Sequence, residues 1–256
     1  MGIINATPDS FYSDSRQQSV DDALQKAEKM LGEGATILDI GGQSTRPGSS
    51  NLNAADELKR VLPAIEAIYH RFPDCFISID TYYSGVAREA VACGACLVND
   101  ISGGTFDTAM TGTVASLHVP YICMHVKGTV ETMHQNPVYE NVTQEVLDYF
   151  IQRIADCTQE GINDIIIDPG FGFSKNSTHN FQLLRTLEVF KILKKPLLLG
   201  ISRKSTIYKT LGIPVEASLN GTTVLHTAGL LKGASILRVH DVKEAMEAIQ
   251  LTEHLK

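Results

Sequence analysis

The 256-residue sequence lacks the local signatures of several common enzyme classes. No Gly-rich dinucleotide fingerprint follows the first apolar run, and no Walker-type phosphate loop occurs. No HExxH pair and no Cys/His pattern with zinc spacing is present, so we do not expect a protein-held catalytic zinc. No serine lies in a nucleophile elbow, which leaves a Ser-His-Asp mechanism without support.

Positive charge is also scarce. The formal net charge of −7 argues against a general nucleic-acid or anionic-membrane binder, although a local basic cluster could still bind an anionic substrate. No apolar run approaches the roughly 20 residues that span a bilayer, and no signal peptide precedes the first predicted strand. We therefore predict a cytoplasmic protein with small-molecule substrates, and neither nucleic acid nor membrane as a partner.

Cysteines are few and scattered. Their odd number, five, does not suit a secreted disulfide framework and favours a reducing cytosol. Cys93 and Cys96 form a CxxC pair, but no basic residue lies near them in the sequence to activate a thiol. We interpret them as small residues at a helix end and at the following strand.

What the chain does contain is a regular alternation of short apolar runs and amphipathic stretches. Most of the apolar runs are continuous, which is typical of strands buried on both faces. The predicted strands are 1–5, 36–40, 76–80, 96–100, 120–125, 164–168, 196–201 and 235–239. Eight strand–helix units without a long linker predict one domain, 1–256, folded as an α/β (β/α)8 TIM barrel.

Three helix boundaries can be predicted from local chemistry. Ser19 is expected to cap a helix that runs to Gly32 and Gly34. Pro63 should kink or break the helix around it. Asp241 and Glu244 resemble a capping box at the start of the last helix.

Polar groups gather where the predicted strands end, which is the end that carries the active site in a barrel of this kind. Each strand exit after the first carries an ionisable group, and the first carries an amide. These residues are Asn5, Asp39, Asp80, Asn99 with Asp100, Met124 with His125, Asp168, the segment 202–205, and Arg238 with His240. Some of them suit the edge of a polar heterocycle, because carboxylates, amides and lysine pair with N–H and C=O groups: Asp80, Asn99, Asp168 and Lys204.

A second set suits phosphates and a hard metal ion: Asn5, Arg46, Arg238 and His240. Arg46 lies in a glycine-flanked turn after the second strand, where a small-residue backbone can approach an anion.

Several polar residues also have structural interpretations. Asp39 could orient the Gly41-Gly42 turn or Arg46 as well as touch a substrate. Asp100 could cap a turn, and His125 could be a satisfied structural histidine. The remaining histidines considered show no ligand spacing: His118, His134, His179 and His226.

Seven ordered motifs now resemble one family over essentially the whole chain. They are the segments 1–11, 39–48, 78–81, 98–104, 168–173, 200–205 and 237–241. The chain resembles the dihydropteroate synthases, pterin-binding TIM barrels of folate biosynthesis. That resemblance implies a transferase that condenses 6-hydroxymethyl-7,8-dihydropterin diphosphate with 4-aminobenzoate and releases diphosphate. It also implies Mg²⁺ and a homodimer.

The resemblance further implies roles for individual residues. The pterin would be held by Asp80, Asn99, Met124, Asp168, Phe173, Lys204 and Arg238. The diphosphate would be held by Asn5, Arg238 and His240, with Asn5 contacting Mg²⁺. The 4-aminobenzoate site and its loops would include Phe11, Thr45, Arg46, Pro47 and Ser205. The residues closest to the chemistry would be Lys204, Arg238, His240 and Asp80.

Three departures from the family pattern bear on these expectations. The first-loop aspartate, Asp14, comes one position later than usual, Gln43 replaces a frequent glutamate, and the chain begins at the first strand. A non-catalytic pterin-binding paralogue would fit the altered first loop. A cobalamin-linked methyltetrahydrofolate methyltransferase would share the pterin pocket but would not need Lys204 with Ser205 or Arg238 with His240.

Overall fold

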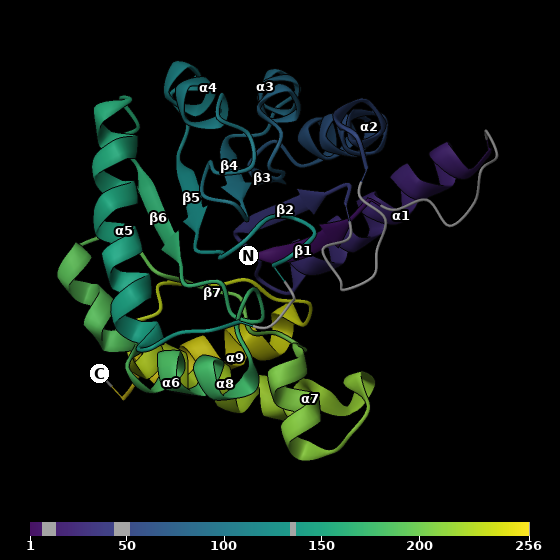
Figure 1. The fold of residues 1–256 in the computed structure, drawn as a ribbon. Coiled ribbons are helices and arrows are strands. Elements are labelled where there is room, and N and C mark those ends of the chain that lie inside the picture. Colours follow the sequence, from purple (N-terminus) through teal and green to yellow (C-terminus); the bar gives the residue numbers. More distant parts are fainter. Residues whose placement is uncertain (7–13, 44–51, 134–136, 256) are drawn as a thin grey trace.

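The fold was analysed in a computed structural model, which describes residues 1–6, 14–43, 52–133 and 137–255. Strands and helices alternate along these residues (Figure 1). The strands are β1 (Gly2–Asn5), β2 (Ile37–Gly41), β3 (Phe76–Asp80), β4 (Leu97–Asp100), β5 (Tyr121–Met124), β6 (Ile165–Asp168), β7 (Leu198–Leu199) and β8 (Ile236–Leu237). The α-helices are α1 (Asp14–Gly32), α2 (Ala54–Arg71), α3 (Ser84–Ala92), α4 (Met110–Leu117), α5 (Val142–Gln159), α6 (Ser177–Arg185), α7 (Ser205–Leu211), α8 (Leu219–Leu231) and α9 (Val242–Glu253). Two 3₁₀-helices, η1 (Leu187–Leu193) and η2 (Val215–Ser218), lie between them.

The strands close into a ring. β1 to β6 pair in parallel in chain order, and β7 pairs in parallel with β8. Single bridges join the two groups, from Ile167 to Leu197 and from Gly2 to Val239. At the second junction the Val239 backbone N–H donates to the Met1 carbonyl over 2.9 Å. The predicted TIM barrel is confirmed, with the helices around its outside (Figure 1).

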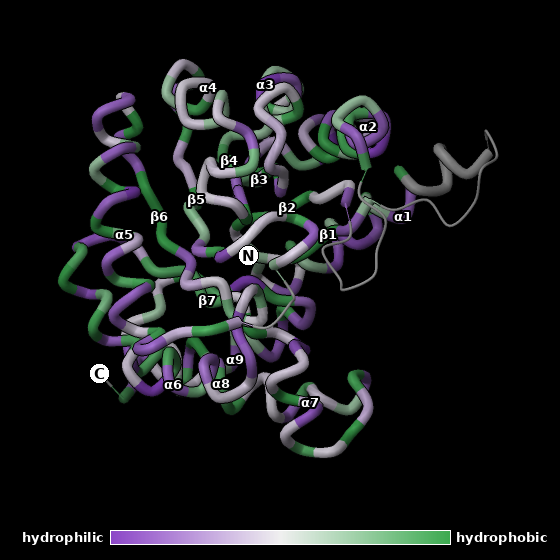
Figure 2. Tube along the Cα trace, viewed as in Figure 1, coloured by the Kyte–Doolittle hydropathy of each residue, from purple (hydrophilic) through white to green (hydrophobic). Residues whose placement is uncertain are grey.

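The core follows from the strand sequences. Side chains such as Ile40, Ile79 and Val98 are fully buried between the sheet and the helix layer. A separate apolar cluster contains Leu97, Ile122 and Leu198. Figure 2 shows a mainly hydrophobic β6 and an α5 that alternates between hydrophobic and hydrophilic residues, as expected for a covered strand and a half-exposed helix.

Three of the predicted helix features are wrong: the cap at Ser19, a break at Pro63 and the capping box at Asp241. The first helix begins at Asp14, five residues before the expected cap at Ser19. α2 runs unbroken through Pro63, because neighbours such as Val61 and Ile65 are fully buried and their packing outweighs one lost backbone hydrogen bond. The Asp241 side chain makes no capping hydrogen bond, since its carboxylate pairs with Arg203 instead.

The two cysteines of the CxxC pair lie where expected. Cys93 ends α3, Cys96 directly precedes β4, and both are free thiols. Among the described residues, no helix is both long enough and apolar enough to cross a membrane.

Candidate active site

The strand register sets polar residues side by side at the carboxyl end of the barrel. Asn5 is paired with Gly41, Gly41 with Asp80, and Asp80 with Asn99, so these positions form one row across β1 to β4. Met124 on β5 is likewise level with Asp168 on β6. Parallel strands without register slips therefore bring residues from six strands to one rim.

Arg238, which follows β8, ties this rim together. Its Nε donates to Asp39 Oδ2 and its Nη2 to Asp80 Oδ2, each over 2.5 Å. Asn99 Nδ2 donates to the same Asp39 oxygen over 3.0 Å. Asp39 is fully buried, whereas the Arg238 side chain is 20% exposed. Asp39 thus orients Arg238 and Asn99, and none of its hydrogen bonds to described residues reaches the Gly41-Gly42 turn; Arg46 lies outside the described residues.

Burial and opposite charge act against each other at this rim. Burial raises the pKa of Asp80 to about 7, while Arg238 lowers it. Burial disfavours the charged form of Arg238, but Asp39 and Asp80 outweigh it and raise the pKa of the guanidinium. Arg238 therefore stays charged at neutral pH, and Nε and Nη2 are the donors that it directs at described residues, which leaves Nη1 without a hydrogen bond within that part of the chain.

Asp168 ends β6 and Lys204 follows β7 on another part of the rim, and both lie close to Gly200. A Cβ at Gly200 would lie 3.6 Å from Asp168 Oδ2 and 3.9 Å from Lys204 Nζ. Asp168 Oδ1 accepts from the Gly170 N–H over 2.8 Å. Lys204 Nζ donates to the Phe171 carbonyl and lies 4.5 Å from the centroid of the Phe173 ring. A carboxylate, an ammonium group and an aromatic face thus meet beside a residue without a side chain.

Burial also shifts the proton affinities of this pair. It lowers the pKa of Lys204 to about 8 against the opposing charge of Asp168. It raises the pKa of Asp168, against Lys204 and the Gly170 hydrogen bond. Perturbed groups of opposite charge in one place are typical of ligand sites.

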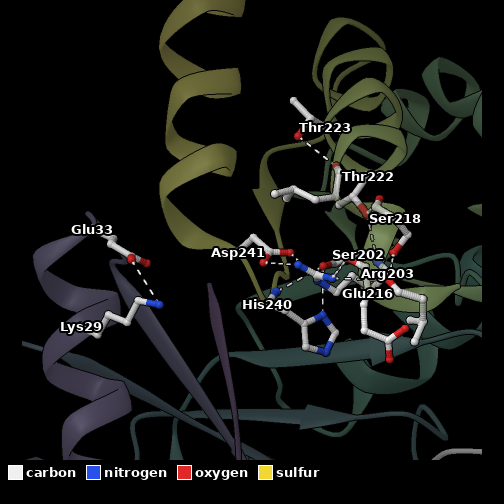
Figure 3. Close-up of polar contacts among 12 residues, drawn as sticks. Lys29, Glu33, Ser202, Arg203, Glu216, Ser218, Thr222, Thr223, His240 and Asp241 are labelled. Carbon is white, nitrogen blue, oxygen red and sulfur yellow. Dashed lines mark hydrogen bonds and ion pairs between the residues drawn. The ribbon is translucent and has the colours of Figure 1, made fainter.

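His240 and Ser202 form a third part of the site (Figure 3). The Ser202 hydroxyl and His240 Nδ1 lie 3.0 Å apart, and the His240 backbone N–H donates to the same hydroxyl over 3.2 Å. Ser202 is buried, whereas the imidazole is exposed. The hydroxyl therefore fixes the ring of His240 at the barrel mouth.

A bidentate ion pair between Arg203 and Asp241 lies next to Ser202 and His240 in the sequence. Arg203 Nε and Nη2 donate to the two carboxylate oxygens of Asp241 over 2.8 and 2.7 Å (Figure 3). Arg203 Nη1 donates to the Glu216 carbonyl over 3.0 Å, and the Arg203 backbone has a positive φ of 53°. Since Arg203 precedes Lys204 and Asp241 follows His240, the pair fixes the β7 and β8 exits relative to each other.

The other predicted residues divide into three groups. Met124 is buried in a cluster with Tyr82 and Ile101, against which Phe173 packs. Asn5 is exposed at the end of β1, and Ser205 is the first residue of α7. Four residues lie outside the part of the chain that the structure describes: Phe11, Thr45, Arg46 and Pro47.

Two structural interpretations of polar residues are confirmed. Asp100 caps a turn, since its carboxylate accepts from the Ser102 and Gly104 backbone N–H groups, each over 2.7 Å. His125 is buried and paired with Lys175 over 2.8 Å. Lys175 itself has no role in the sequence-based prediction; the only signal was a lysine directly after an otherwise apolar, glycine-rich loop.

Comparisons with known proteins agree with this geometry. A family model described as "Pterin binding enzyme" matches residues 1–240. The dihydropteroate synthase of Escherichia coli (strain K12) is 43% identical over 255 residues, which cover 99% of this chain and 90% of that protein. A Yersinia pestis dihydropteroate synthase in complex with a sulfonamide drug has a TM-score of 0.93 at 39% identity, covering 100% of this chain and 93% of that one. A Xanthomonas albilineans dihydropteroate synthase with 4-aminobenzoic acid has a TM-score of 0.91 at 36% identity, covering 100% and 92%. The chain belongs to the pterin-binding enzyme family, among the dihydropteroate synthases.

Proposed function

We propose that this transferase condenses 6-hydroxymethyl-7,8-dihydropterin diphosphate with 4-aminobenzoate, giving 7,8-dihydropteroate and diphosphate. The observation that carries the proposal is the rim itself. Its carboxylates and lysine suit a heterocycle, its arginine and histidine suit an anion, and the barrel that carries them is closely similar to dihydropteroate synthases. The names of those relatives also supply the product, which the geometry alone does not specify.

The pterin would lie between Asp80 with Asn99 on one side and Asp168 with Lys204 on the other. Asp168 Oδ2 faces the open position beside Gly200, where a ring N–H could donate to it. Lys204 could donate to a ring carbonyl or nitrogen, and Met124 and Phe173 would supply apolar contact. Arg238, extended across the rim, would cover the ring.

The diphosphate would bind beside Arg238 and His240, which both follow β8 at the carboxyl end of the barrel. As the bond from the pterin methylene to oxygen breaks, negative charge develops on the diphosphate, and these two groups would stabilise it. The pterin ring can delocalise the positive charge left on the methylene, so no covalent enzyme intermediate is required. The 4-aminobenzoate amine then attacks that carbon.

A Mg²⁺ ion fits the donor set at this position. Mg²⁺ usually retains several waters and is held by few protein oxygens together with substrate phosphates. Asn5 offers an exposed carboxamide at the β1 exit, and the described residues contain no cluster of three or more acidic, histidine or cysteine ligands that could hold a metal without the substrate. When bound, the ion would neutralise charge on the leaving diphosphate.

The 4-aminobenzoate site would be completed by Ser205 and by the predicted loop residues Phe11, Thr45, Arg46 and Pro47. We expect this site to form only when diphosphate is bound. Calorimetric titration of 4-aminobenzoate, with and without inorganic diphosphate and Mg²⁺, tests this order. Arg46→Ala should raise the KM for 4-aminobenzoate and leave pterin diphosphate binding largely intact; equal 4-aminobenzoate affinity in both conditions would mean that the site is preformed.

The experiment that tests the function is turnover of both substrates with and without Mg²⁺, followed by diphosphate release. We expect release that depends on 4-aminobenzoate and on the metal. Tight pterin binding without release would favour the non-catalytic paralogue. Methyl transfer from methyltetrahydrofolate would favour the cobalamin-linked enzyme.

We also propose a cytoplasmic homodimer, with no nucleic-acid or membrane partner. The five free thiols suit a reducing compartment. α8 contains no charged residue, and its Val224 and Leu231 are 57% and 50% exposed. A second copy covering this apolar face would bury both side chains. Sedimentation of the wild type and of Val224→Glu tests the dimer, which the glutamate should weaken.

A further inference from the structure

Lys175 is a buried lysine outside the groups assigned to substrate. It lies between the loop that follows β6 and the start of α6, and only 7% of it is exposed. None of the ion pairs between described residues includes it. Burial lowers the pKa of Lys175 to about 7, against the opposing charge of Asp168, so its charged form depends on the acceptors that surround it.

The acceptors around Lys175 Nζ come from two strand exits. The group lies 3.2 Å from the Gly170 carbonyl, 3.1 Å from the Phe173 carbonyl and 3.4 Å from the His125 carbonyl. It lies 2.8 Å from His125 Nδ1. Burial and the charge of Lys175 hold the pKa of His125 well below its ordinary value, so the imidazole is neutral and its Nδ1 can accept.

The loop held in this way carries two of the residues assigned to the pterin. The Gly170 N–H donates to Asp168 Oδ1 over 2.8 Å, and Gly170 has a positive φ of 72°. A Cβ at Gly170 would meet the His125 carbonyl at 2.1 Å, so the loop passes directly over the β5 exit. The Phe173 ring, at the far end of the loop, lies 4.5 Å from Lys204 Nζ.

Each contact of Lys175 therefore constrains a group that faces the ligand. Fixing the Gly170 peptide fixes the N–H that orients Asp168. Fixing the Phe173 carbonyl fixes the backbone from which the aromatic wall projects. The His125 contacts anchor both to β5, next to Met124.

We infer that Lys175 is a positioning residue, whose ammonium group converges on three carbonyls to set the Asp168 carboxylate and the Phe173 ring for the pterin. The inference rests on the proposed function, since it assigns the pterin to those two side chains. It predicts that Lys175 matters for the heterocycle and not for the anion, because Arg238 is held by Asp39 and Asp80, and His240 by Ser202.

Titrating two ligands into the same variants separates an effect on heterocycle binding from an effect on anion binding. Calorimetry would measure a phosphate-free pterin, pterin-6-carboxylate, and inorganic diphosphate with Mg²⁺. In Lys175→Met we expect at least a tenfold loss of pterin affinity and less than a threefold change for diphosphate. Lys26→Met, at an exposed lysine of α1, serves as the matched control and should leave both affinities unchanged. Equal losses for both ligands, or unchanged pterin affinity, would overturn the inference.

A second variant covers the case in which Lys175→Met does not fold. Lys175→Arg retains the charge, but a planar guanidinium cannot point its donors at the same three carbonyls. We expect a pterin-specific loss of at least threefold, and wild-type pterin affinity would overturn the inference. If the wild type itself bound no pterin, the proposed function would fail first; if it bound pterin and the variants bound equally well, only the role of Lys175 would fail.

Discussion

Arg238→Met should destabilise the fold as well as the site. The substitution removes the cation that lies 2.5 Å from both Asp39 and Asp80, while leaving the two carboxyl groups in place. Asp39 is fully buried, so its charge cannot be transferred to water without unfolding. Breaking a buried ion pair from one side typically costs about 3–5 kcal/mol. Because Arg238 is 20% exposed, we expect the lower end, about 3 kcal/mol at neutral pH.

The cause can be separated from simple loss of packing. The double variant Arg238→Met with Asp39→Asn removes the uncompensated charge at the fully buried Asp39, leaves the Asp80 carboxyl group in place, and retains an oxygen that can accept from Asn99. It should recover at least half of the lost stability. The deficit of the single variant should also shrink at low pH, because the folded state of that variant would bind a proton more tightly than the unfolded chain does.

Urea unfolding at pH 5.0 and 7.5, followed by circular dichroism, measures these differences for the wild type, both single variants and the double variant. Titration with diphosphate in the same variants should show weaker binding wherever Arg238 is absent. Additive losses of stability in the double variant, or a deficit independent of pH, would refute the reasoning.

Three further predictions follow from the described contacts. Asp168→Asn should fold but lose pterin affinity, by an amount on the order of 1–3 kcal/mol in calorimetry, because ring N–H groups would lose a charged acceptor. His240→Ala should weaken binding of diphosphate more than binding of a phosphate-free pterin, and the reverse order would place the anion elsewhere. Burial, followed by the charge of Asp80, raises the pKa of Glu57 from 4.5 to about 8. Between these two pH values the folded protein keeps a proton on Glu57 that the unfolded chain releases, so the free energy of unfolding falls as the pH rises. Glu57→Gln removes this loss, and its stability advantage should therefore be larger at pH 8 than at pH 5, by about 3 kcal/mol; an equal difference at both pH values would show that Glu57 is ionised in the fold.

The barrel could be predicted from the sequence because its strands are easy to recognise. Most of the runs are continuous and apolar, which is the pattern of parallel strands that are covered on both faces. The exits were predictable for the same reason, since polar residues directly after such runs must reach one rim. Asn99 and Asp80 are an example, because their pairing requires only that adjacent strands keep their register.

What the sequence did not predict is how the polar groups share partners. Asp39 could have paired with several neighbours. Its ion pair with Arg238 joins residues 199 positions apart in the chain, and the sequence does not show that they are in contact. Asp241 looked like a helix cap, but a bidentate arginine is a stronger partner than a backbone N–H. Lys175 gave almost no signal, because the acceptors around it are mainly backbone carbonyls, which every residue carries.

The most direct test of the central claim is the identity of the product. Purified protein would be incubated with the pterin diphosphate, ¹⁵N-labelled 4-aminobenzoate and Mg²⁺. The products would then be separated by chromatography and identified by mass spectrometry. The proposed function predicts labelled 7,8-dihydropteroate and diphosphate in equal amounts, and much less of both from Asp168→Asn at the same substrate concentration, set below the KM of the wild type. Hydrolysed pterin without a carbon–nitrogen bond to the label, or no reaction at all, would contradict it.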